Sequence, residues 1–440
     1  MTGARPLVAL VVAAAAPAGA NPVDAFGFGA RGPAMAGAQT AATQDGGANY
    51  YNPAALALGD EIRIDLGYQL AKPYLRIGGG DQGVDASRGL AISLTAPGDI
   101  GPLHLAVGLA AFLPDERITR TRTLPSARPR WALYDNRPQR LFLASNLALR
   151  IGDDLTIGGG IAYLSRTEGS IDLDGLIGFP DPNDSNLSLD IDVALKTVRY
   201  VQAGILWRAR PWLLVGASYR AGFVLQLDQG FRIHGDLGPP GFPVVKDGSF
   251  DLHSLAFDLF QPEQWSAGFS LQLTPRVLVA GDLTFQRWST YENPAARIEI
   301  TYDLKQLNDL VTITTGPPLE KAYFHDTFVP RIGVEWLAAE TLCSVWRVRA
   351  GYAFEPSPAP EQQGELNTVD NDKHTVTAGL GVTLARLTDV LPHPVDLDVY
   401  VGATFLPARA HRKLSVTDPV GDYVSEGLVL MAGVGTRWRF

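Results

Sequence analysis

Apolar and polar residues alternate along many short segments of this chain, from residue 61 to its C-terminus. In EIRIDLGYQL, which runs from Glu61 to Leu70, every second residue from Ile62 onward is apolar, and the residues between them are mostly charged or polar. A period of two predicts a β-strand with one apolar face. The pattern predicts about 14 strands, at residues 61–71, 87–96, 103–113, 139–150, 155–166, 191–207, 212–227, 264–273, 277–288, 327–337, 345–355, 374–385, 394–406 and 428–440.

The connections between these segments alternate between short turns and long loops. Short turns occur at Gly152 to Asp154 and Thr274 to Arg276, and long segments include Glu168 to Asp190 and Gln229 to Pro262. A soluble β-sandwich would share the strand pattern, but this pairing of short turns with long loops is typical of membrane barrels. We therefore expect an all-β fold in which residues 61–440 form a 14-stranded antiparallel transmembrane β-barrel with long extracellular loops and both ends on the periplasmic side.

The last predicted strand, GLVLMAGVGTRWRF, carries apolar residues on one face up to Trp438 and Phe440, and Arg437 and Arg439 on the other. Aromatic residues at a strand end suit the membrane interface, and inward arginines can stay in water. A chain that ends in Phe on such a strand resembles the insertion signal of bacterial outer-membrane proteins. This resemblance implies an outer-membrane location, with outer-membrane lipid and the barrel assembly machinery as partners.

Two segments precede the first strand. Residues 1–20 contain one basic residue, Arg5, an apolar run from Leu7 to Ala16 and a small-residue site at Ala18-Gly19-Ala20, which predicts a cleaved secretory signal peptide. The apolar run is shorter than the ~20 residues of a membrane-spanning helix. Residues 21–60 are rich in Gly and Ala, nearly free of charge, and show neither strand nor amphipathic helix periodicity. We expect them to form a plug, or hatch, inside the barrel lumen.

Composition excludes several other classes of protein. The 440 residues include 46 Gly and 31 Pro, which favours many turns and few long helices. The chain carries 46 acidic and 37 basic residues without a block of like charges, which disfavours a nucleic-acid partner. The single cysteine, Cys343, excludes an internal disulfide and a cysteine-rich metal site. The 7 histidines lack metal-ligand spacing, so we expect no metal and no cofactor.

Motifs for nucleotide binding and for catalysis have little support. Gly27 to Gly32 matches G-x-G-x-x-G but does not follow a strand, so we interpret these glycines as tight turns of the plug. The G-x-S-x-G motif is missing, and we expect the protein not to be an enzyme. An outer-membrane hydrolase is the catalytic alternative, and it would need a Ser, His or Asp group that converges near the loops.

The N-terminal segment resembles the hatch of the FadL-type outer-membrane transporters of long-chain fatty acids and other hydrophobic compounds. The Gly-Ala stretch from Gly27 to Ala42, the turn from Gln44 to Ala48 and the tripeptide Asn52-Pro53-Ala54 carry the match. Similar motifs downstream are Gln261-Pro262-Glu263-Gln264-Trp265, Gln286-Arg287-Trp288-Ser289, His325-Asp326-Thr327-Phe328, Arg349 to Pro360 and Asp370-Asn371-Asp372-Lys373-His374. The resemblance covers most of the mature chain and implies a monomeric 14-stranded barrel for passive uptake of hydrophobic small molecules.

The resemblance also implies a gate. In the family, substrate leaves laterally through the wall at a kink in the third strand, close to the Asn-Pro-Ala motif. We nominate Gly108 for this kink, because glycine interrupts a strand most readily. The candidate gating residues are Asn52, Pro53, Ala54 and Gly108.

A hydrophobic substrate needs a dry path, because each methylene exposed to water costs about 0.8 kcal/mol. We expect a pocket between the plug and the barrel wall, with Phe26, Phe28 and Leu56 as candidate lining. Two long loops are also more apolar than water-exposed loops should be. Their candidate substrate-binding residues are Leu176, Phe179, Phe242, Leu252 and Phe257. The resemblance to the family implies that these loops form a groove that first captures the lipid. The alternative is that their apolar residues pack against one another.

The substrate class stays open at this point. A carboxylate would need a basic group in the lumen, for which the inward arginines Arg63, Arg331, Arg347 and Arg349 are candidates. An aromatic hydrocarbon would need none, and the family serves both classes. The alternatives to fatty-acid uptake are therefore an aromatic-hydrocarbon channel of the same family, a sealed structural or adhesive barrel, and the hydrolase named above.

Overall fold

The computed structural model of the chain describes residue 23 and residues 26–116, 128–135, 140–178, 181–291, 297–310, 321–364, 366–385 and 393–440. The predicted signal peptide lies outside the described residues. Within these ranges, no helix is both long enough and apolar enough to cross a membrane.

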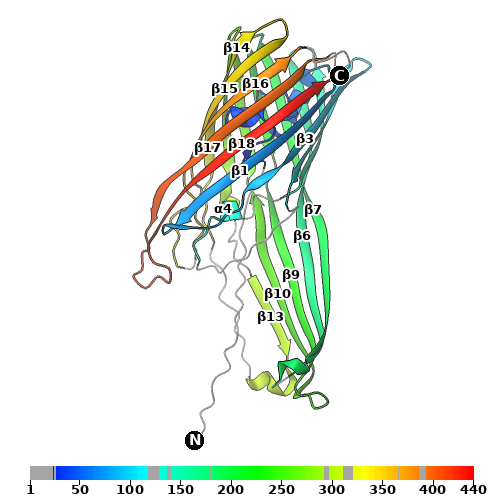
Figure 1. The fold of residues 1–440 in the computed structure, drawn as a ribbon, viewed down its shortest axis with the longest axis vertical. Coiled ribbons are helices and arrows are strands. Elements are labelled where there is room, and N and C mark those ends of the chain that lie inside the picture. The colour runs from blue at the N-terminus through cyan, green and yellow to red at the C-terminus, as the bar shows by residue number, and fades with distance from the viewer. Residues whose placement is uncertain are drawn as a thin grey trace.

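Fourteen strands of the described residues close into one antiparallel barrel (Figure 1). The first and last strands complete the circle, with paired residues from Arg63↔Arg439 to Ile77↔Ser425. The barrel strands are β1 (Arg63–Ile77), β3 (Ser87–Ile100), β4 (Leu103–Pro114), β5 (Phe142–Ile151), β6 (Leu155–Ile177), β7 (Asn186–Arg210), β8 (Leu213–Arg220), β11 (Glu263–Thr274), β12 (Val277–Arg287), β14 (Thr327–Glu340), β15 (Ser344–Glu355), β16 (Lys373–Leu384), β17 (Val395–His411) and β18 (Tyr423–Arg439).

The predicted fold class is confirmed, because each predicted segment overlaps one of these strands. One segment extends too far. The strand expected at 212–227 is split, since β8 ends at Arg220 and the next strand begins at Phe223. Gly222 lies between them, and a Cβ at this position would stand 2.7 Å from the backbone nitrogen of Glu263. The chain leaves the barrel wall at this close backbone contact.

The two ends of the barrel differ. At the end where β1 begins and β18 finishes, which we call the turn end, the connections are short, as at Gly152–Asp154 between β5 and β6. The opposite end, the loop end, carries the long connections. Side chains along each strand alternate between outside and lumen: in β6, Ile157 and Ile161 are 39% and 40% exposed, whereas Ala162 and Leu164 are fully buried. The barrel therefore has an apolar outer surface, as its sequence period requires.

A sheet projects past the loop end (Figure 1) and is formed by the outer parts of β6 and β7 together with three further strands. β6 and β7 extend to Ile177 and Asn186, and β9 (Phe223–Leu237), β10 (Val245–Gln261) and β13 (Arg297–Asp303) join them. β9 pairs in parallel with β6, and β10 pairs antiparallel with both β9 and β13. The expectation of long loops is wrong for these stretches. The period of two continues in these stretches. Many of their polar positions are acidic residues or Gly, which are common in loops, and the sequence therefore predicted loops instead of strands.

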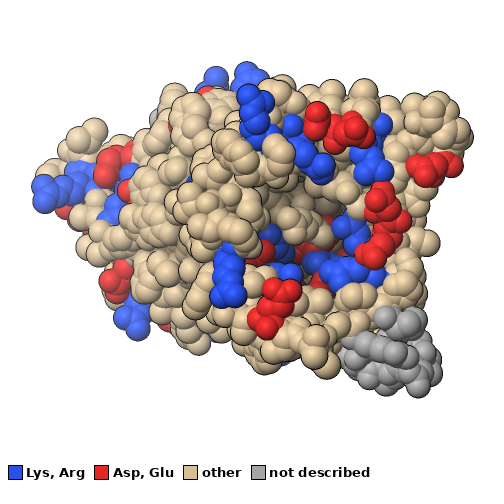
Figure 2. Space-filling model, turned by 90° about the horizontal axis from the view of Figure 1, so that it is seen from above, with Lys and Arg blue, Asp and Glu red and all other residues tan. Residues whose placement is uncertain are grey.

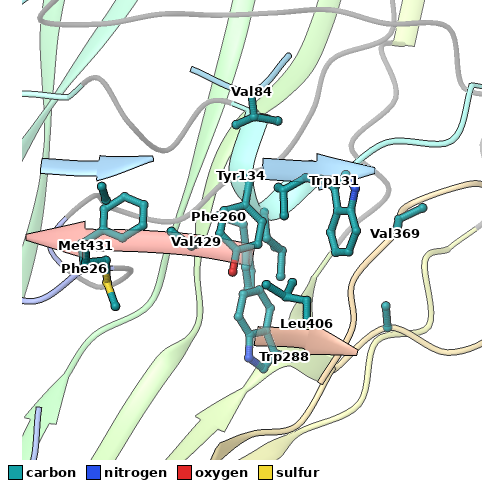
Figure 3. Close-up of a cluster of buried hydrophobic side chains, with 14 of the residues drawn as sticks. Phe26, Val84, Trp131, Tyr134, Phe260, Trp288, Val369, Leu406, Val429 and Met431 are labelled. Carbon is teal, nitrogen blue, oxygen red and sulfur yellow. The ribbon is translucent and has the colours of Figure 1, made fainter. Parts of the chain in front are cut away.

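The loop end of the lumen is closed by a lid, which we define as residues 128–135, 321–326, 356–364 and 366–372. Its side chains pack with strand residues into a buried apolar cluster (Figure 3). Trp131 is fully buried in this cluster, and Trp288 is 2% exposed with its ring centroid 5.6 Å from that of Phe260. The remaining short elements outside the N-terminal segment are β2 (Gly80–Asp81), α4 (Ala132–Asp135), η2 (Pro182–Asp184), η3 (Trp288–Thr290) and η4 (Lys305–Leu310).

Candidate functional site in the barrel lumen

Residues 26–58, which we call the N-terminal segment, lie inside the barrel. The segment contains three short helices, α2 (Arg31–Ala34), α3 (Ala48–Tyr51) and η1 (Pro53–Leu58), and almost all of its side chains are buried. Asn52 starts η1: its side-chain oxygen accepts a hydrogen bond from the Ala54 backbone nitrogen, and Pro53 occupies the first helical position. Both residue types favour a helix start because they satisfy or remove unpaired backbone donors.

The tripeptide Asn52-Pro53-Ala54 contacts the barrel wall at glycine residues, which have no side chain to keep the two backbones apart. A Cβ at Gly158 of β6 would stand 2.5 Å from the Pro53 carbonyl carbon, and one at Gly204 of β7 would stand 1.9 Å from Asn52 Oδ1. Asn52 Nδ2 also donates to the carbonyl oxygens of Thr40 (2.7 Å) and Ile205 (3.2 Å). The motif therefore binds the segment both to itself and to the barrel wall.

A second patch of glycines receives the other side of the segment. A Cβ at Gly351 of β15 would stand 2.3 Å from the Met35 carbonyl carbon, and one at Gly333 of β14 would stand 2.7 Å from Met35 Cβ. Thr377 of β16 donates to the carbonyl of Ala34 at 3.0 Å and accepts from the Ala36 backbone nitrogen at 3.1 Å. The segment is thus wedged across the lumen between two parts of the wall.

A buried chain of charges links the segment to β14, β15 and β17. Arg31 Nε lies 3.1 Å from Glu335 Oε2, and the same oxygen accepts from Arg349 Nε at 2.5 Å. Arg349 also pairs with Asp398. The side chains of Arg31 and Arg349 are each 4% exposed, and those of Glu335 and Asp398 are 12% and 11% exposed. Removing one member would leave a buried charge without its partner, which typically costs 3–5 kcal/mol.

A second charge cluster lies near the turn end. Arg437 of β18 contacts Asp45 of the segment at 3.4 Å, Asp65 of β1 at 2.8 Å and Asp396 of β17 at 2.9 Å. Arg63 donates to the Gln44 carbonyl at 3.1 Å and the Leu56 carbonyl at 3.4 Å. Figure 2 looks onto this end, where basic and acidic side chains gather around a hollow. The segment is therefore held by ionic contacts as well as by packing.

Between the segment and the wall lies a cavity of about 120 Å³, which we call the lumen cavity. Phe26 and Tyr51 of the segment line it, together with polar groups of the wall that include Arg220, Asp282 and Arg331. Asp282 Oδ2 accepts from the backbone nitrogens of Gln39 (2.8 Å) and Thr40 (2.9 Å). A separate cavity of about 200 Å³ lies at the turn end beside Leu58. The segment stands between the two cavities.

The four arginines nominated for a carboxylate head group have different surroundings. Arg63 is bonded to the segment and Arg349 to two carboxylates, as described above. Arg347 donates to Thr383 at 2.7 Å and does not line the lumen cavity. Arg331 donates to Thr284 at 2.7 Å and lines the cavity. Among the described residues no carboxylate lies within 4.0 Å of the Arg331 guanidinium, so it is the nominated arginine best placed to meet an anion.

The predicted lining and gating residues fall into distinct places. Phe26 lines the lumen cavity, Phe28 is buried against Phe142, and Leu56 is fully buried near β4. At Gly108 the ladders of β4 with β3 and β5 run without a register shift. A Cβ there would stand 2.2 Å from Asn49 Oδ1, so in this state the glycine serves close contact with the segment. The gating role stays a prediction.

The predicted loop residues lie on the projecting sheet. Leu176 is near the end of β6, and Phe242, 82% exposed, lies in the turn between β9 and β10. Leu252 and Phe257 are in β10, and Phe179 lies outside the described residues. Sequence reasoning missed Asp282, Glu335 and Arg220, which hold or border the segment. A usable signal existed for the first two, since each is an acidic residue at an inward position within an otherwise apolar strand.

His411, at the loop end of β17, belongs to the contacts that hold the lid. It is 1% exposed, and its Nε2 lies 2.8 Å from Ser425 Oγ. Ser425 donates in turn to Asn371 Oδ1 at 2.7 Å. Arg409 Nη1 donates to the Asp370 carbonyl at 2.8 Å, and Lys413 Nζ to the Gln362 carbonyl at 2.8 Å. The imidazole therefore sits between two cations in a buried site.

We expect acid to loosen the lid. Burial, with a smaller effect from Arg409, lowers the pKa of His411 from 6.5 to about 4, so the closed lid holds a neutral imidazole. An opened lid binds more protons between these values, and the closed lid therefore loses stability as the pH falls from about 6.5 to about 4. The protection of residues 366–372 against hydrogen exchange, measured relative to the intrinsic exchange rate at each pH, should fall over this range. His411→Gln should flatten the response, and an identical pH profile in both proteins would contradict the assignment.

Comparisons with known proteins give relatives of the same architecture. A protein-family model described as outer membrane protein transport protein (OMPP1/FadL/TodX) matches residues 135–390. A long-chain fatty acid transport protein of Escherichia coli O6:H1 is 21% identical over 252 residues, which are 54% of this chain and 49% of that protein. The chain thus spans about half the length of this relative. A long-chain fatty acid transport protein of Escherichia coli K12 is 20% identical over 228 residues, 51% of this chain and 43% of that protein.

Two solved structures share the fold. A Pseudomonas aeruginosa FadL homologue has a TM-score of 0.58 at 14% identity, and the match covers 93% of this chain and 98% of that one. The Pseudomonas putida toluene transporter TodX has a TM-score of 0.53 at 13% identity, with 94% and 99% covered. At these identities the similarity is one of fold, and it includes a FadL homologue and a toluene transporter.

Proposed function

The chain belongs to the outer membrane protein transport protein family (OMPP1/FadL/TodX), and from this premise we propose that it takes up hydrophobic compounds by passive diffusion. The protein lies in the outer membrane. In barrels of this kind short turns face the periplasm, so the lid and the projecting sheet face the outside. The observation that carries the proposal is the N-terminal segment, which stands inside a closed barrel between two cavities.

The N-terminal segment acts as the hatch in this proposal. Its contacts are of two kinds: close packing of Asn52, Pro53 and Met35 on wall glycines, and ionic contacts through Arg31 and Asp45. Glycine surfaces allow a small displacement without side-chain rearrangement, whereas the ionic contacts resist it. A substrate in the lumen cavity touches the segment directly through Phe26. Binding that favours a displaced segment would then open the path.

Capture and exit follow the family's route. We assign first contact with the substrate to apolar groups at the tip of the projecting sheet, where Phe242 and Val244 are 82% and 54% exposed and Leu176 lies nearby in β6. We assign lateral exit to the wall at Gly108, because displacement of Asn49 and Leu56 would remove the groups that contact this glycine. The substrate that fits best is an amphiphile with an anionic head group, since Arg331 lines the cavity and, among the described residues, no carboxylate lies within 4.0 Å of its guanidinium, although Asp282 lies opposite it on β12.

The experiment that tests this function is uptake into vesicles that contain the purified barrel, with Asn52→Ala as the hatch variant. The substitution removes the four hydrogen bonds of the Asn52 side chain, with Thr40, Ile205, Ala217 and Ala54, and a hydrogen bond typically contributes about 1 kcal/mol. We expect a folded, heat-modifiable barrel whose uptake of a fluorescent long-chain fatty acid rises about tenfold. Asn183→Ala, at the exposed turn beyond β6, is the matched control.

Two results would count against the proposal. If the intact protein does not speed uptake at all, the barrel is sealed and serves a structural or adhesive role. If the protein speeds uptake but Asn52→Ala and Asn183→Ala give the same uptake rate, the transport function is supported and the assignment of the N-terminal segment as the hatch is wrong.

A further inference from the structure

The outward face of β6 and β7 carries two apolar bands instead of one. Near the membrane, Val201, Ile205 and Trp207 are 54%, 44% and 52% exposed. Farther out, Leu189, Ile191 and Val193 are 57%, 56% and 65% exposed. The pairing of β6 with β7 runs without a register shift from Leu155↔Trp207 to Leu176↔Asn186. Strict alternation therefore places both bands on the same, outward side of the wall.

A polar band separates them. Tyr163 of β6 lies opposite Arg199 of β7, whose guanidinium is 5.9 Å from the ring centroid, and Thr197 follows on the same face. An aromatic residue beside an arginine is typical of the membrane interface. The distance from Val201 to Val193 is about 26 Å along the strand. Lipid tails that cover the first band therefore do not reach the second.

The outer band widens into an apolar face across the projecting sheet, which we call the distal face. Register places apolar residues of all five strands side by side on it. They are Leu187, Leu189, Ile191 and Val193 of β7, Ile171 and Leu173 of β6, Phe231 and Ile233 of β9, Phe250 and Leu252 of β10, and Ile300 and Tyr302 of β13. The opposite face carries Asp172, Asp174, Asp190, Asp192, Arg232, His234 and Asp251.

The distal face is of the wrong shape for a small ligand. Ligand sites are concave and enclose most of the ligand, whereas a single sheet offers a flat surface. A sheet with one apolar face normally covers it with another layer, and two sheets pack face to face about 10 Å apart. Seven residues on each of five strands span about 24 Å by about 24 Å, or about 600 Å². Two such faces together reach about 1,200 Å², the lower limit of a stable protein interface.

We propose that the distal face packs against the same face of a second copy of this chain. Because it points outward from the barrel, a twofold axis along the membrane normal brings two distal faces together while both barrels stay in one bilayer. This interface goes beyond uptake through the lumen, and it replaces the monomer that the family resemblance implied.

Cysteine crosslinking in intact outer membranes tests the proposal, and the chain suits it because Cys343 is the sole cysteine. In a Cys343→Ser background, single cysteines are placed at successive positions from residue 188 to residue 193. We expect a short bis-maleimide to give dimers at Leu189, Ile191 and Val193 and severalfold less at Ser188, Asp190 and Asp192. The residues of the second set lie on the same strand but on the acidic face, so they are matched controls.

Native mass spectrometry in mild detergent provides a second measurement. The unmodified protein should appear at twice the chain mass, and Ile191→Lys with Val193→Lys should appear at the mass of one chain while keeping a heat-modifiable barrel and unchanged uptake. A monomer in both proteins, with or without a bound apolar compound, overturns the proposal. Equal crosslinking on both faces also overturns it, because that result indicates pairing through the free edge of β7. Uptake itself is measured separately, so its failure would not be mistaken for failure of the dimer.

Discussion

Gly158→Ala is expected to displace the N-terminal segment and to raise leakage through the barrel. The added methyl group would stand 2.5 Å from the Pro53 carbonyl carbon and 2.6 Å from the Ala54 backbone nitrogen. Backbone atoms cannot rotate away as a flexible side chain does, so the segment has to move. Overpacking of this kind typically costs 1–3 kcal/mol, and each 1.4 kcal/mol shifts the seated and displaced populations about tenfold.

Single-channel conductance in planar bilayers measures this displacement directly. Gly158→Ala should show frequent openings that the unmodified protein lacks, and its fatty-acid uptake should rise about tenfold or more. Gly159→Ala is the control, because its methyl group points to the opposite side of the same strand and would meet the Gln202 carbonyl at 3.3 Å. Equal conductance in the two variants, with both barrels folded, would mean that contact at Gly158 does not hold the hatch closed.

The barrel was predictable from the sequence because each of its strands has a lipid-facing side. A strand such as β1 must place Ile64, Leu66 and Tyr68 outward, and this requirement produces an apolar residue at every second position of the sequence. The projecting strands follow the same period. Their polar positions are dense in Asp, as in SLDIDV of β7, which is a composition that loops share. The acidic composition therefore hid the alternation of apolar and polar residues in these strands, which becomes clear once their pairing with neighbouring strands is known.

The position of the N-terminal segment was predictable only as a resemblance. Its seating depends on pairs far apart in the chain, such as Arg31 with Glu335 and Met35 with Gly351, and a single sequence holds no record of such pairs. The four nominated arginines illustrate the same limit. Parity places all of them inward, yet only three-dimensional neighbours distinguish Arg349, bonded to two carboxylates, from Arg331, which lines the cavity.

The substrate class depends on that difference. The lumen cavity is lined by hydroxyl, amide and charged groups as well as by Phe26 and Tyr51, so a neutral hydrocarbon would place apolar atoms against many polar groups and exclude water from them. An amphiphile places its chain against the aromatic groups and its head group near Arg331. A hydrogen bond between two charged groups contributes about 1.5–3 kcal/mol. Removal of the guanidinium charge should therefore weaken an anionic substrate and spare a neutral one.

Arg331→Gln is expected to lower uptake of long-chain fatty acids about tenfold or more while leaving uptake of the matching alcohols and of toluene within about twofold. Glutamine keeps a donor for Thr284 and much of the side-chain volume, so the variant changes charge more than packing. Arg347→Gln is a matched control, because Arg347 also donates to a threonine on the neighbouring strand at 2.7 Å but lies outside the cavity. Competition between labelled fatty acid and its alcohol in the same vesicles measures the selectivity. If both variants lose acid and alcohol uptake equally, Arg331 stabilises the barrel wall and does not bind the head group of the substrate. If neither variant loses acid uptake, the substrate is carried without its charge being recognised, and a neutral hydrocarbon becomes the better substrate class.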